Sequence, residues 1–283
     1  MRVPMRDPMR VGEYMTQNPF TVSEQTSMKE AVLMLDRHHI RHLPVTNGSR
    51  VVGMVTDRDI RRASPSLQSG IEGDYEQVLA ATPVARIMTK EPVTVMTVTE
   101  DTPLVDAVRA MVEKKFGALP VVRGEELIGI ISEIDALKLL AERKEVLPMR
   151  IGEYMIQKLF TVPEEASMKE AVSLLGRHHI RHLPVTNGSR LVGMVTDRDI
   201  RRATPSLLSG IRREDFEQVL VATSVARIMT KEPVTVTEDT PLVDAVRVMV
   251  EKKFGSLPVV RGEDLIGIFT DIDALKVLLE ELE

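Results

Sequence analysis

Internal repetition constrains this chain more than any other feature of its sequence. The string HHIRHLPVTNGSR at 38–50 recurs letter for letter at 178–190, and GMVTDRDIRRA and VARIMTKEPVTV recur in the same way. The stretch from Pro8 to about Leu147 is followed by a second version of itself that runs from Pro148 to the end. Because such self-similarity is typical of chains built from repeated structural units, both halves are expected to share one fold.

An older repeat lies within each half. In the first half, MTQNPFTV at 15–22 matches MTKEPVTV at 88–95, HLPV at 42–45 matches ALPV at 118–121, and GMVTDRDI at 53–60 matches GIISEIDA at 129–136. These copies differ at most other positions, so the shared positions are under structural or functional constraint. The sequence therefore predicts two modules of two repeats each, at 9–147 (repeats 9–73 and 82–147) and 148–283 (repeats 148–213 and 223–283).

Each repeat carries the same series of local signals, which predicts an α/β (α+β) fold of small sheets flanked by helices. In the first repeat, a short strand at 20–22 precedes a helix that Ser27-x-x-Glu30 opens as a capping box. In the second repeat, Thr102 is followed by Pro103 at the expected first helical position. Apolar residues then recur at helical spacing.

A hairpin and a second helix complete each repeat. The dipeptide Asn47-Gly48 is typical of a two-residue hairpin turn, and it lies between predicted strands at 42–46 and 51–55. A second helix is expected to begin near Thr56. A loop and a linking helix are predicted between the repeats, at 64–73 and 74–81.

Composition excludes several classes of protein. The 283 residues include no Cys, which excludes disulfides, thiolate metal sites and Cys nucleophiles. The N-terminal MRVPMRDPMRVGEYM lacks the apolar run of a signal peptide, and no stretch is long enough to span a bilayer, so a cytoplasmic protein is expected. The formal net charge of −5 disfavours a general nucleic-acid binder. We predict no enzyme, because common nucleotide and nucleophile motifs do not occur and the repeats leave no room for a catalytic domain.

One motif occurs once in every repeat: a Gly in the returning strand, a hydroxyl residue three positions later, and an Asp three positions after that. The pairs are Thr56 and Asp59, Ser132 and Asp135, Thr196 and Asp199, and Thr270 and Asp273. At a strand-to-helix junction, free backbone N–H groups and the helix dipole favour an anion. The Asp carboxylate can also accept two hydrogen bonds from a vicinal diol such as a ribose. The same two residues make a good helix start, so from the residues alone both roles remain open.

Units that end in G-x-x-[ST]-x-x-D after an LPV strand resemble cystathionine β-synthase (CBS) domains, and the resemblance covers nearly the whole chain. It implies four CBS repeats in two Bateman modules that bind adenosine-containing ligands in the clefts between paired repeats. The four Asp residues would then accept bonds from ribose hydroxyls, and the four hydroxyl residues would lie near the ribose or the α-phosphate. The adenine would contact the first strands, at Thr21, Val22, Thr94, Val95, Thr161, Val162, Thr235 and Val236.

Basic residues are distributed unevenly between the repeats. The first and third repeats have Arg-His before LPV and an Arg inside TDRD, whereas the second and fourth have Gly-Ala or Gly-Ser and an Ile there. This arrangement is similar to the γ subunit of AMP-activated kinase. It implies phosphate contacts from Arg41, His42, Arg181 and His182, with Arg58 and Arg198 as further candidates. Arg can bind phosphate bidentately, whereas His contributes charge only when protonated.

The resemblance therefore predicts a regulatory, energy-sensing protein that binds AMP, ADP or ATP, the last together with Mg²⁺, and changes its module arrangement on binding. S-adenosylmethionine is an alternative ligand, no cofactor is required, and the regulated partner is unknown. The two modules are expected to form a disk, either within one chain or in a homodimer.

The sequence also bears on three other kinds of function. The basic helix with Arg58, Arg61 and Arg62 could contact nucleic acid, although acids are interspersed and the net charge is negative. The modules could also be purely structural, with empty clefts. A metal site is not expected, because the predicted helix ends between His38 and His42 and no acidic third ligand is near.

Overall fold

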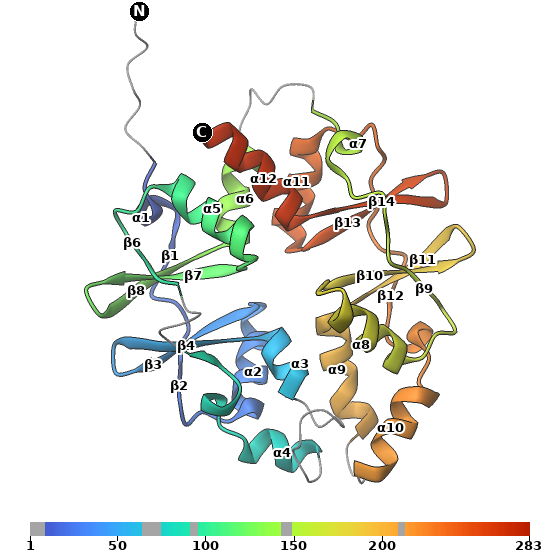
Figure 1. Cartoon of the computed structure of the whole chain (residues 1–283), viewed down its shortest axis with the longest axis horizontal. Helices are drawn as coiled ribbons and strands as arrows, with labels where there is room; N and C mark the ends of the chain where they lie inside the picture. The colour runs from blue at the N-terminus through green and yellow to red at the C-terminus, as the bar shows by residue number, and fades with distance from the viewer. Residues whose placement is uncertain (1–8, 64–74, 91–95, 143–148, 209–212) are drawn as a thin grey trace, which may run out of the picture.

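The chain folds into four similar units, each built around a two-stranded hairpin with a helix before it and a helix after it (Figure 1). This computed structural model describes residues 9–63, 75–90, 96–142, 149–208 and 213–283. The four repeats lie in two halves, coloured blue to green and yellow to red in Figure 1. The predicted α/β (α+β) class is confirmed.

The first half contains two repeats joined by the predicted linking helix, α4 (Tyr75–Ala81). The first repeat comprises α1 (Val11–Tyr14), β1 (Thr16–Gln17), β2 (Val22–Ser23), α2 (Met28–His38), β3 (His42–Asn47), β4 (Arg50–Thr56) and α3 (Asp57–Ala63). The second comprises a 3-10 turn (Val84–Arg86), β5 (Thr89–Lys90), β6 (Val98–Thr99), α5 (Leu104–Lys114), β7 (Ala118–Arg123), β8 (Glu126–Ser132) and α6 (Glu133–Glu142).

The second half repeats this order around the linking helix α10 (Arg213–Ala222). The third repeat comprises α7 (Ile151–Tyr154), β9 (Val162–Pro163), α8 (Met168–Arg177), β10 (His182–Asn187), β11 (Arg190–Thr196) and α9 (Asp197–Leu208). The fourth comprises a 3-10 turn (Val225–Arg227), β12 (Thr230–Lys231), α11 (Leu242–Lys252), β13 (Ser256–Arg261), β14 (Asp264–Thr270) and α12 (Asp271–Leu282).

Local signals in the sequence give the expected elements with small shifts. The Ser27 capping box forms, since the Glu30 N–H donates to Oγ of Ser27 at 3.2 Å and the Ser27 N–H donates to Oε2 of Glu30 at 3.1 Å. Pro103 is the residue before α5, one position earlier than predicted, because its ψ of 133° is extended. The hairpin turn consists of Gly48 and Ser49, again shifted by one residue, and Gly48 has a φ of +60° that suits glycine.

The two repeats of each half interlock through their N-terminal segments. Strand β2 pairs in parallel with β3 of its own repeat, whereas β1 pairs with β8 of the second repeat and β5 pairs with β4 of the first. The second half follows the same rule, with β12 on β11 and Ile156 bridged to Ile268. The hairpins of each half also meet at their tips, where Arg50 pairs with Glu126 and Arg190 with Asp264.

This exchange explains the glycine of the repeated motif. A Cβ atom added at Gly53 would lie 2.5 Å from Sδ of Met88 and 2.8 Å from the carbonyl oxygen of Thr89, which belong to the crossing segment. The other three motif glycines meet a crossing methionine in the same way, Gly129 with Met15, Gly193 with Met229 and Gly267 with Met155. These glycines therefore allow close backbone approach inside each module.

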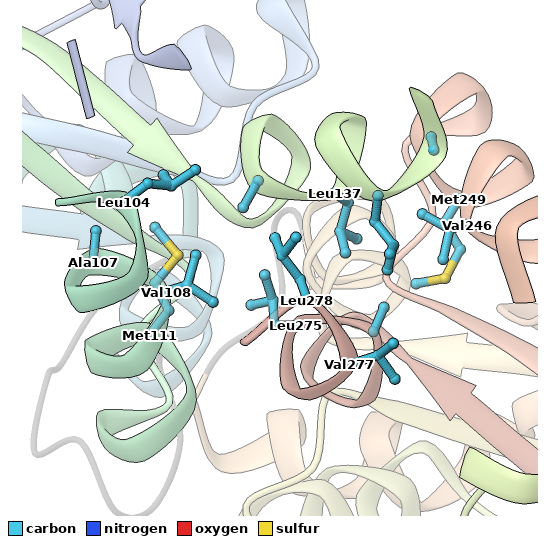
Figure 2. Close-up of a cluster of buried hydrophobic side chains, with 14 of the residues drawn as sticks. Leu104, Ala107, Val108, Met111, Leu137, Val246, Met249, Leu275, Val277 and Leu278 are labelled. Atoms are coloured by element: carbon cyan, nitrogen blue, oxygen red, sulfur yellow. The ribbon is translucent and has the colours of Figure 1, made fainter. Parts of the chain in front are cut away.

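The two halves pack against each other within the chain. Helices α5 and α6 pack on α11 and α12, and α3 packs on α9 (Figure 1). Figure 2 shows the first of these contacts, a single apolar cluster in which Leu104 and Leu137 of one half lie with Leu275 and Leu278 of the other. All four side chains are buried, so this cluster is a core shared by both halves.

Candidate functional site

The hydroxyl and the Asp of the repeated motif contact each other at the start of the last helix in every repeat. The Thr56 hydroxyl and N–H donate to Oδ2 of Asp59 at 2.6 and 3.0 Å, and the Asp59 N–H donates to Oγ1 of Thr56 at 3.3 Å. The hydroxyl-to-carboxylate distances in the other repeats are 2.6, 2.7 and 2.6 Å, at Ser132–Asp135, Thr196–Asp199 and Thr270–Asp273. The capping role is therefore present in all four repeats, and it uses one of the two carboxylate oxygens.

In two of the repeats a lysine also binds the motif carboxylate. In the second and fourth repeats a lysine one turn later binds it, with Lys138 Nζ 2.9 Å from Oδ1 of Asp135 and Lys276 Nζ 3.1 Å from Oδ1 of Asp273. Both lysines are half-exposed and can move aside. In the third repeat, burial raises the pKa of Asp199, and hydrogen bonds from Thr196 oppose that effect.

A cavity of about 800 Å³ joins the motif of the first repeat to that of the fourth. Its wall includes Thr56 and Asp59 from one half and Thr270 and Asp273 from the other. This volume is within the usual range for small-molecule sites. The cavity therefore brings two copies of the motif into one space between the halves.

The wall of this cavity combines apolar and cationic side chains. The apolar residues include Met54, Met96, Val112, Phe116, Pro120, Ile156, Leu159, Phe160, Pro184 and Ile268. The cationic residues are Arg58, Lys114, Lys115, Lys158, Arg181 and Lys276, and His42, His179 and His182 also line it. Such a wall can hold a flat apolar ring and an anionic group at the same time.

Two of the predicted phosphate-binding residues, Arg41 and Arg181, are held by carboxylates. Nη2 of Arg181 lies 2.8 Å from Oε1 of Glu133 and 2.9 Å from Oδ1 of Asp271, and Nη1 of Arg41 lies 3.5 Å from Oδ2 of Asp271 and 3.9 Å from Oε2 of Glu133. The carboxylate side chains are 2% and 1% exposed. We call these four residues the central ion cluster. Each half supplies one arginine and one acid to it.

Burial and charge act against each other in the central ion cluster. Burial would raise the pKa of Glu133, but the charges of Arg181 and Arg41 lower it to about 2. Burial raises the pKa of Asp271, and Arg181 opposes that shift. Burial would likewise lower the pKa of Arg181, but Asp271 and Glu133 raise it above its ordinary value. Arg181 and Glu133 therefore both stay charged at neutral pH, and their ion pair holds the cluster together.

His42 and His182 fill space in the neighbouring repeat of their own half. A Cβ atom added at Gly117 would overlap the His42 ring, and one added at Gly255 would lie 2.7 Å from Nε2 of His182. This packing explains why the second and fourth repeats have Gly where the others have Arg. Burial lowers the pKa of His42 to about 4 and that of His182 to about 3, so both rings are neutral at pH 7.

The two further phosphate candidates have different surroundings. Arg58 lines the cavity. Nε of Arg198 lies 3.7 Å from Oδ2 of Asp57, the residue directly after Thr56, and Arg201 is ion-paired with the same carboxylate at 2.8 Å. The acid that follows the hydroxyl in the first repeat therefore holds arginines of the third repeat.

The adenine contacts predicted at the first strands stay a prediction, and the residues concerned do not line this cavity. Val22 and Val162 are 5% and 3% exposed and belong to the hydrophobic clusters beneath their sheets, so they do not line the cavity. Thr21, Thr161, Thr235 and the partly buried Val236 are also absent from its wall. The exposed side chains of Met96 and Phe160 lie there instead.

In the second repeat the predicted first strand falls on Thr94 and Val95, which lie outside the described residues. The strand β6 pairs Val98 with Val121 in the register that pairs Val22 with Val45. Val98 is therefore the structural counterpart of Val22. The sequence before this strand is three residues longer in the second repeat than in the fourth. The letters TVTED at 97–101, and not TV at 94–95, therefore mark the strand.

Sequence reasoning missed the acids of the central ion cluster and the two lysines that bind motif carboxylates. A signal for the acids was present, because an acid directly follows the hydroxyl in all four repeats, at Asp57, Glu133, Asp197 and Asp271. Their arginine partners are far away in the sequence. That distance hides the pairing from any local pattern.

Two histidines outside the cavity wall stack on phenylalanine rings. The His38 ring stacks on Phe20 and the His178 ring on Phe160, both with ring centroids 3.7 Å apart. Across the described ranges, no group of three or more His, Asp or Glu side chains is placed to hold a metal ion. Within the same ranges, no helix combines the length and the apolar character that crossing a bilayer requires.

Comparison with known proteins agrees with this architecture. The sequence profile described as the CBS domain matches residues 11–66, 84–142, 151–206 and 225–280. Protein MJ1225 of Methanocaldococcus jannaschii is 28% identical over 271 residues, which are 90% of this chain and 94% of that protein. Protein MJ1404 of the same organism is 28% identical over 288 residues, 99% of this chain, and the chain spans 64% of its length.

Two solved structures have the same fold over nearly the whole chain. The MJ1225 structure superposes with a TM-score of 0.82 at 24% identity and covers 95% of this chain and 99% of its own. A conserved uncharacterised protein from Pyrococcus horikoshii superposes with a TM-score of 0.63 at 26% identity, covering 95% and 100%. The chain belongs to the CBS-domain family, with four CBS repeats in two Bateman modules.

Proposed function

We propose that this CBS-domain chain is a regulatory protein that binds adenine nucleotides between its modules and signals their binding through the arrangement of the modules. The observation that carries the proposal is the cavity of about 800 Å³, which joins two Thr-x-x-Asp helix starts to a wall rich in lysine and arginine. A ligand that fits this wall has a diol, an anionic group and a flat ring, which together describe a nucleotide.

Asp59 and Asp273 are the proposed ribose ligands in this cavity. The cap uses Oδ2 of each carboxylate, and a carboxylate has about four acceptor positions on its two oxygens, so each Asp is proposed to accept a ribose hydroxyl as well. At Asp273 the ribose must displace Lys276, whose amine can then turn toward a phosphate. Asp135 and Asp199 have the same cap and are proposed to act in the same way.

The other parts of the nucleotide have matching surfaces. In this cavity, Met96, Phe116 and Phe160 offer apolar contacts for adenine. Arg58, Lys114, Lys115 and Lys158 offer positive charge for AMP, ADP or ATP. Protein MJ1225 is described as a candidate archaeal homologue of g-AMPK, which supports an adenylate ligand here.

Regulation follows from the position of the cavity between the modules. A ligand that contacts both halves favours the arrangement for which it has the higher affinity, and shifts the population by that difference alone. A partner protein would recognise the favoured arrangement.

A thermal shift series on the whole chain tests the proposal. Adenosine, AMP, ADP, ATP with and without Mg²⁺, and S-adenosylmethionine are the ligands, with UMP as a control for the base. At least one adenosine compound should raise the unfolding temperature, since a ligand at 100 times its Kd stabilises the folded state by about 2.7 kcal/mol. No shift with any adenosine compound at millimolar concentration would leave the modules a purely structural role. DNA binding that falls steeply with salt would favour the nucleic-acid interpretation.

A further inference from the structure

The central ion cluster occupies the place where a ligand phosphate would meet Arg41 and Arg181. Arg181 and Asp271 both line the cavity, and Asp271 directly follows Thr270 of the proposed nucleotide site. An anion that approaches Arg181 from the cavity therefore also approaches the carboxyl group of Asp271. This inference rests on the proposed function and deepens it.

The carboxylates hold the arginines in the geometry that a phosphate would use. Nη1 of Arg181 lies 3.4 Å and Nη2 lies 2.8 Å from the two oxygens of Glu133, a two-pronged contact of the kind that guanidinium groups make with carboxylate and phosphate alike. Nη2 of Arg181 also donates to Asp271 at 2.9 Å. The donors that face Glu133 and Asp271 are therefore already used.

Charge balance in the cluster also opposes a bound phosphate. Two guanidinium groups face two carboxylates, and the acids are almost completely buried. A phosphate placed against Arg181 would add negative charge beside the ionised Glu133 in a poorly screened environment. The pKa of Glu133, held at about 2 by the arginines, keeps that acid ionised at neutral pH.

We propose that Asp271 and Glu133 are built-in competitors for the anion site formed by Arg181 and Arg41, and that they set the phosphate selectivity of the protein. With the acids in place, a 5′-phosphate gains little from these arginines, so adenosine and AMP bind with similar affinity at this cavity. A phosphate that binds Arg181 in place of Glu133 also breaks an ion pair between the two halves. The ligand phosphate is thereby coupled to the module arrangement.

Two probes separate this proposal from the proposed function. Adenosine reports the nucleoside site, and inorganic phosphate reports the anion site without a nucleoside. Calorimetry on the full chain measures the affinities for adenosine, AMP and inorganic phosphate in the wild type and in Asp271→Asn and Glu133→Gln. Asp239→Asn and Glu126→Gln are the matched controls, because each removes one negative charge at an exposed position outside the cluster.

In Asp271→Asn the affinity for AMP and for inorganic phosphate should rise about tenfold, while the affinity for adenosine stays the same. Glu133→Gln should act in the same direction, and the two controls should leave all three affinities unchanged. Unchanged phosphate and AMP affinities in both variants, with adenosine still bound, would overturn the competitor role and leave the proposed function standing.

The other outcomes are equally decisive. Absence of adenosine binding in the wild type, together with tighter phosphate binding in Asp271→Asn, would end the proposed function and keep the anion site. Loss of folding in both variants would assign the acids to stability alone and overturn the proposal. An equal gain in the control variants would show a general charge effect and would also overturn it.

Discussion

Nη2 of Arg181, in the second module, lies 2.8 Å from Oε1 of Glu133, in the first. The side chains are 24% and 2% exposed, so this ion pair is largely removed from water. It connects the two modules at the edge of the cavity, next to the motif of the fourth repeat. The same arginine thus contributes to the contact between modules and to the candidate ligand site.

Breaking this pair should destabilise the protein strongly. Arg181→Gln leaves Glu133 and Asp271 buried with Arg41 as their remaining partner in the cluster, and an incompletely compensated buried charge costs about 3–5 kcal/mol. Urea unfolding measures the change in the free energy of unfolding. Arg123→Gln, which breaks an exposed pair with Glu100, should leave it nearly unchanged. Equal effects of the two substitutions would contradict the assigned role of the pair.

The motif glycines should tolerate no side chain. Gly53→Ala places a methyl group 2.5 Å from Sδ of Met88, and the resulting overpacking should destabilise the fold by about 1–3 kcal/mol. Gly176, in helix α8, has open space around an added Cβ atom. Gly176→Ala should therefore stabilise the protein by about 0.5–1 kcal/mol, since alanine loses less backbone entropy in a helix. Thermal unfolding of both variants checks the opposite signs.

The buried histidines should make the protein sensitive to acid. The pKa of His42 is about 4 in the folded state and about 6.5 in an unfolded chain, and that of His182 is lower still. The unfolded state therefore binds more protons between these values, so stability falls as the pH drops from about 6.5 toward 4. NMR titration of the imidazole signals tests the cause directly. Titration of the His42 and His182 rings near pH 6.5, in place of about 4 or below, would contradict this packing.

The apolar core shared by the halves should unfold them together. Leu278, fully buried in this core, should cost about 2–5 kcal/mol when changed to Ala. Leu33, on α2, is 55% exposed, and Leu33→Ala should change the free energy of unfolding by less than about 0.5 kcal/mol. Calorimetric unfolding of the wild type should show one transition. Two separate transitions would mean that this cluster does not join the halves.

Local chemistry in the sequence was sufficient to predict most of the fold. The Ser27 capping box, the Asn47-Gly48 turn and the Thr56-x-x-Asp59 helix start are each decided by residues within a few positions of one another. Repetition then extended each prediction to the other copies. The errors of one residue at Pro103 and at the hairpin turn fall at element ends, where small backbone preferences decide.

Contacts between distant segments could not be predicted in this way. Arg41 meets Asp271 across 230 positions, and the exchange of N-terminal segments within each module is invisible to local periodicity. The uneven distribution of arginine is visible in the sequence, but the pairing of these arginines with their acids is not. The displaced first strand at Val98 shows how an insertion in a loop misleads a comparison of repeats.

The central claim is that the motif carboxylates, besides capping their helices, accept hydrogen bonds from the two hydroxyls of a ribose. Calorimetry with AMP and with 2′,3′-dideoxy-AMP on the wild-type chain tests it most directly. Hydrogen bonds to a charged group contribute about 1.5–3 kcal/mol each, so loss of both hydroxyls should weaken binding by at least about a hundredfold. In Asp59→Asn and Asp273→Asn this preference should shrink, while Asp106→Asn, in the first turn of α5, should keep it. Equal affinity of the wild type for AMP and its dideoxy analogue would contradict the account and leave these carboxylates with the helix start alone.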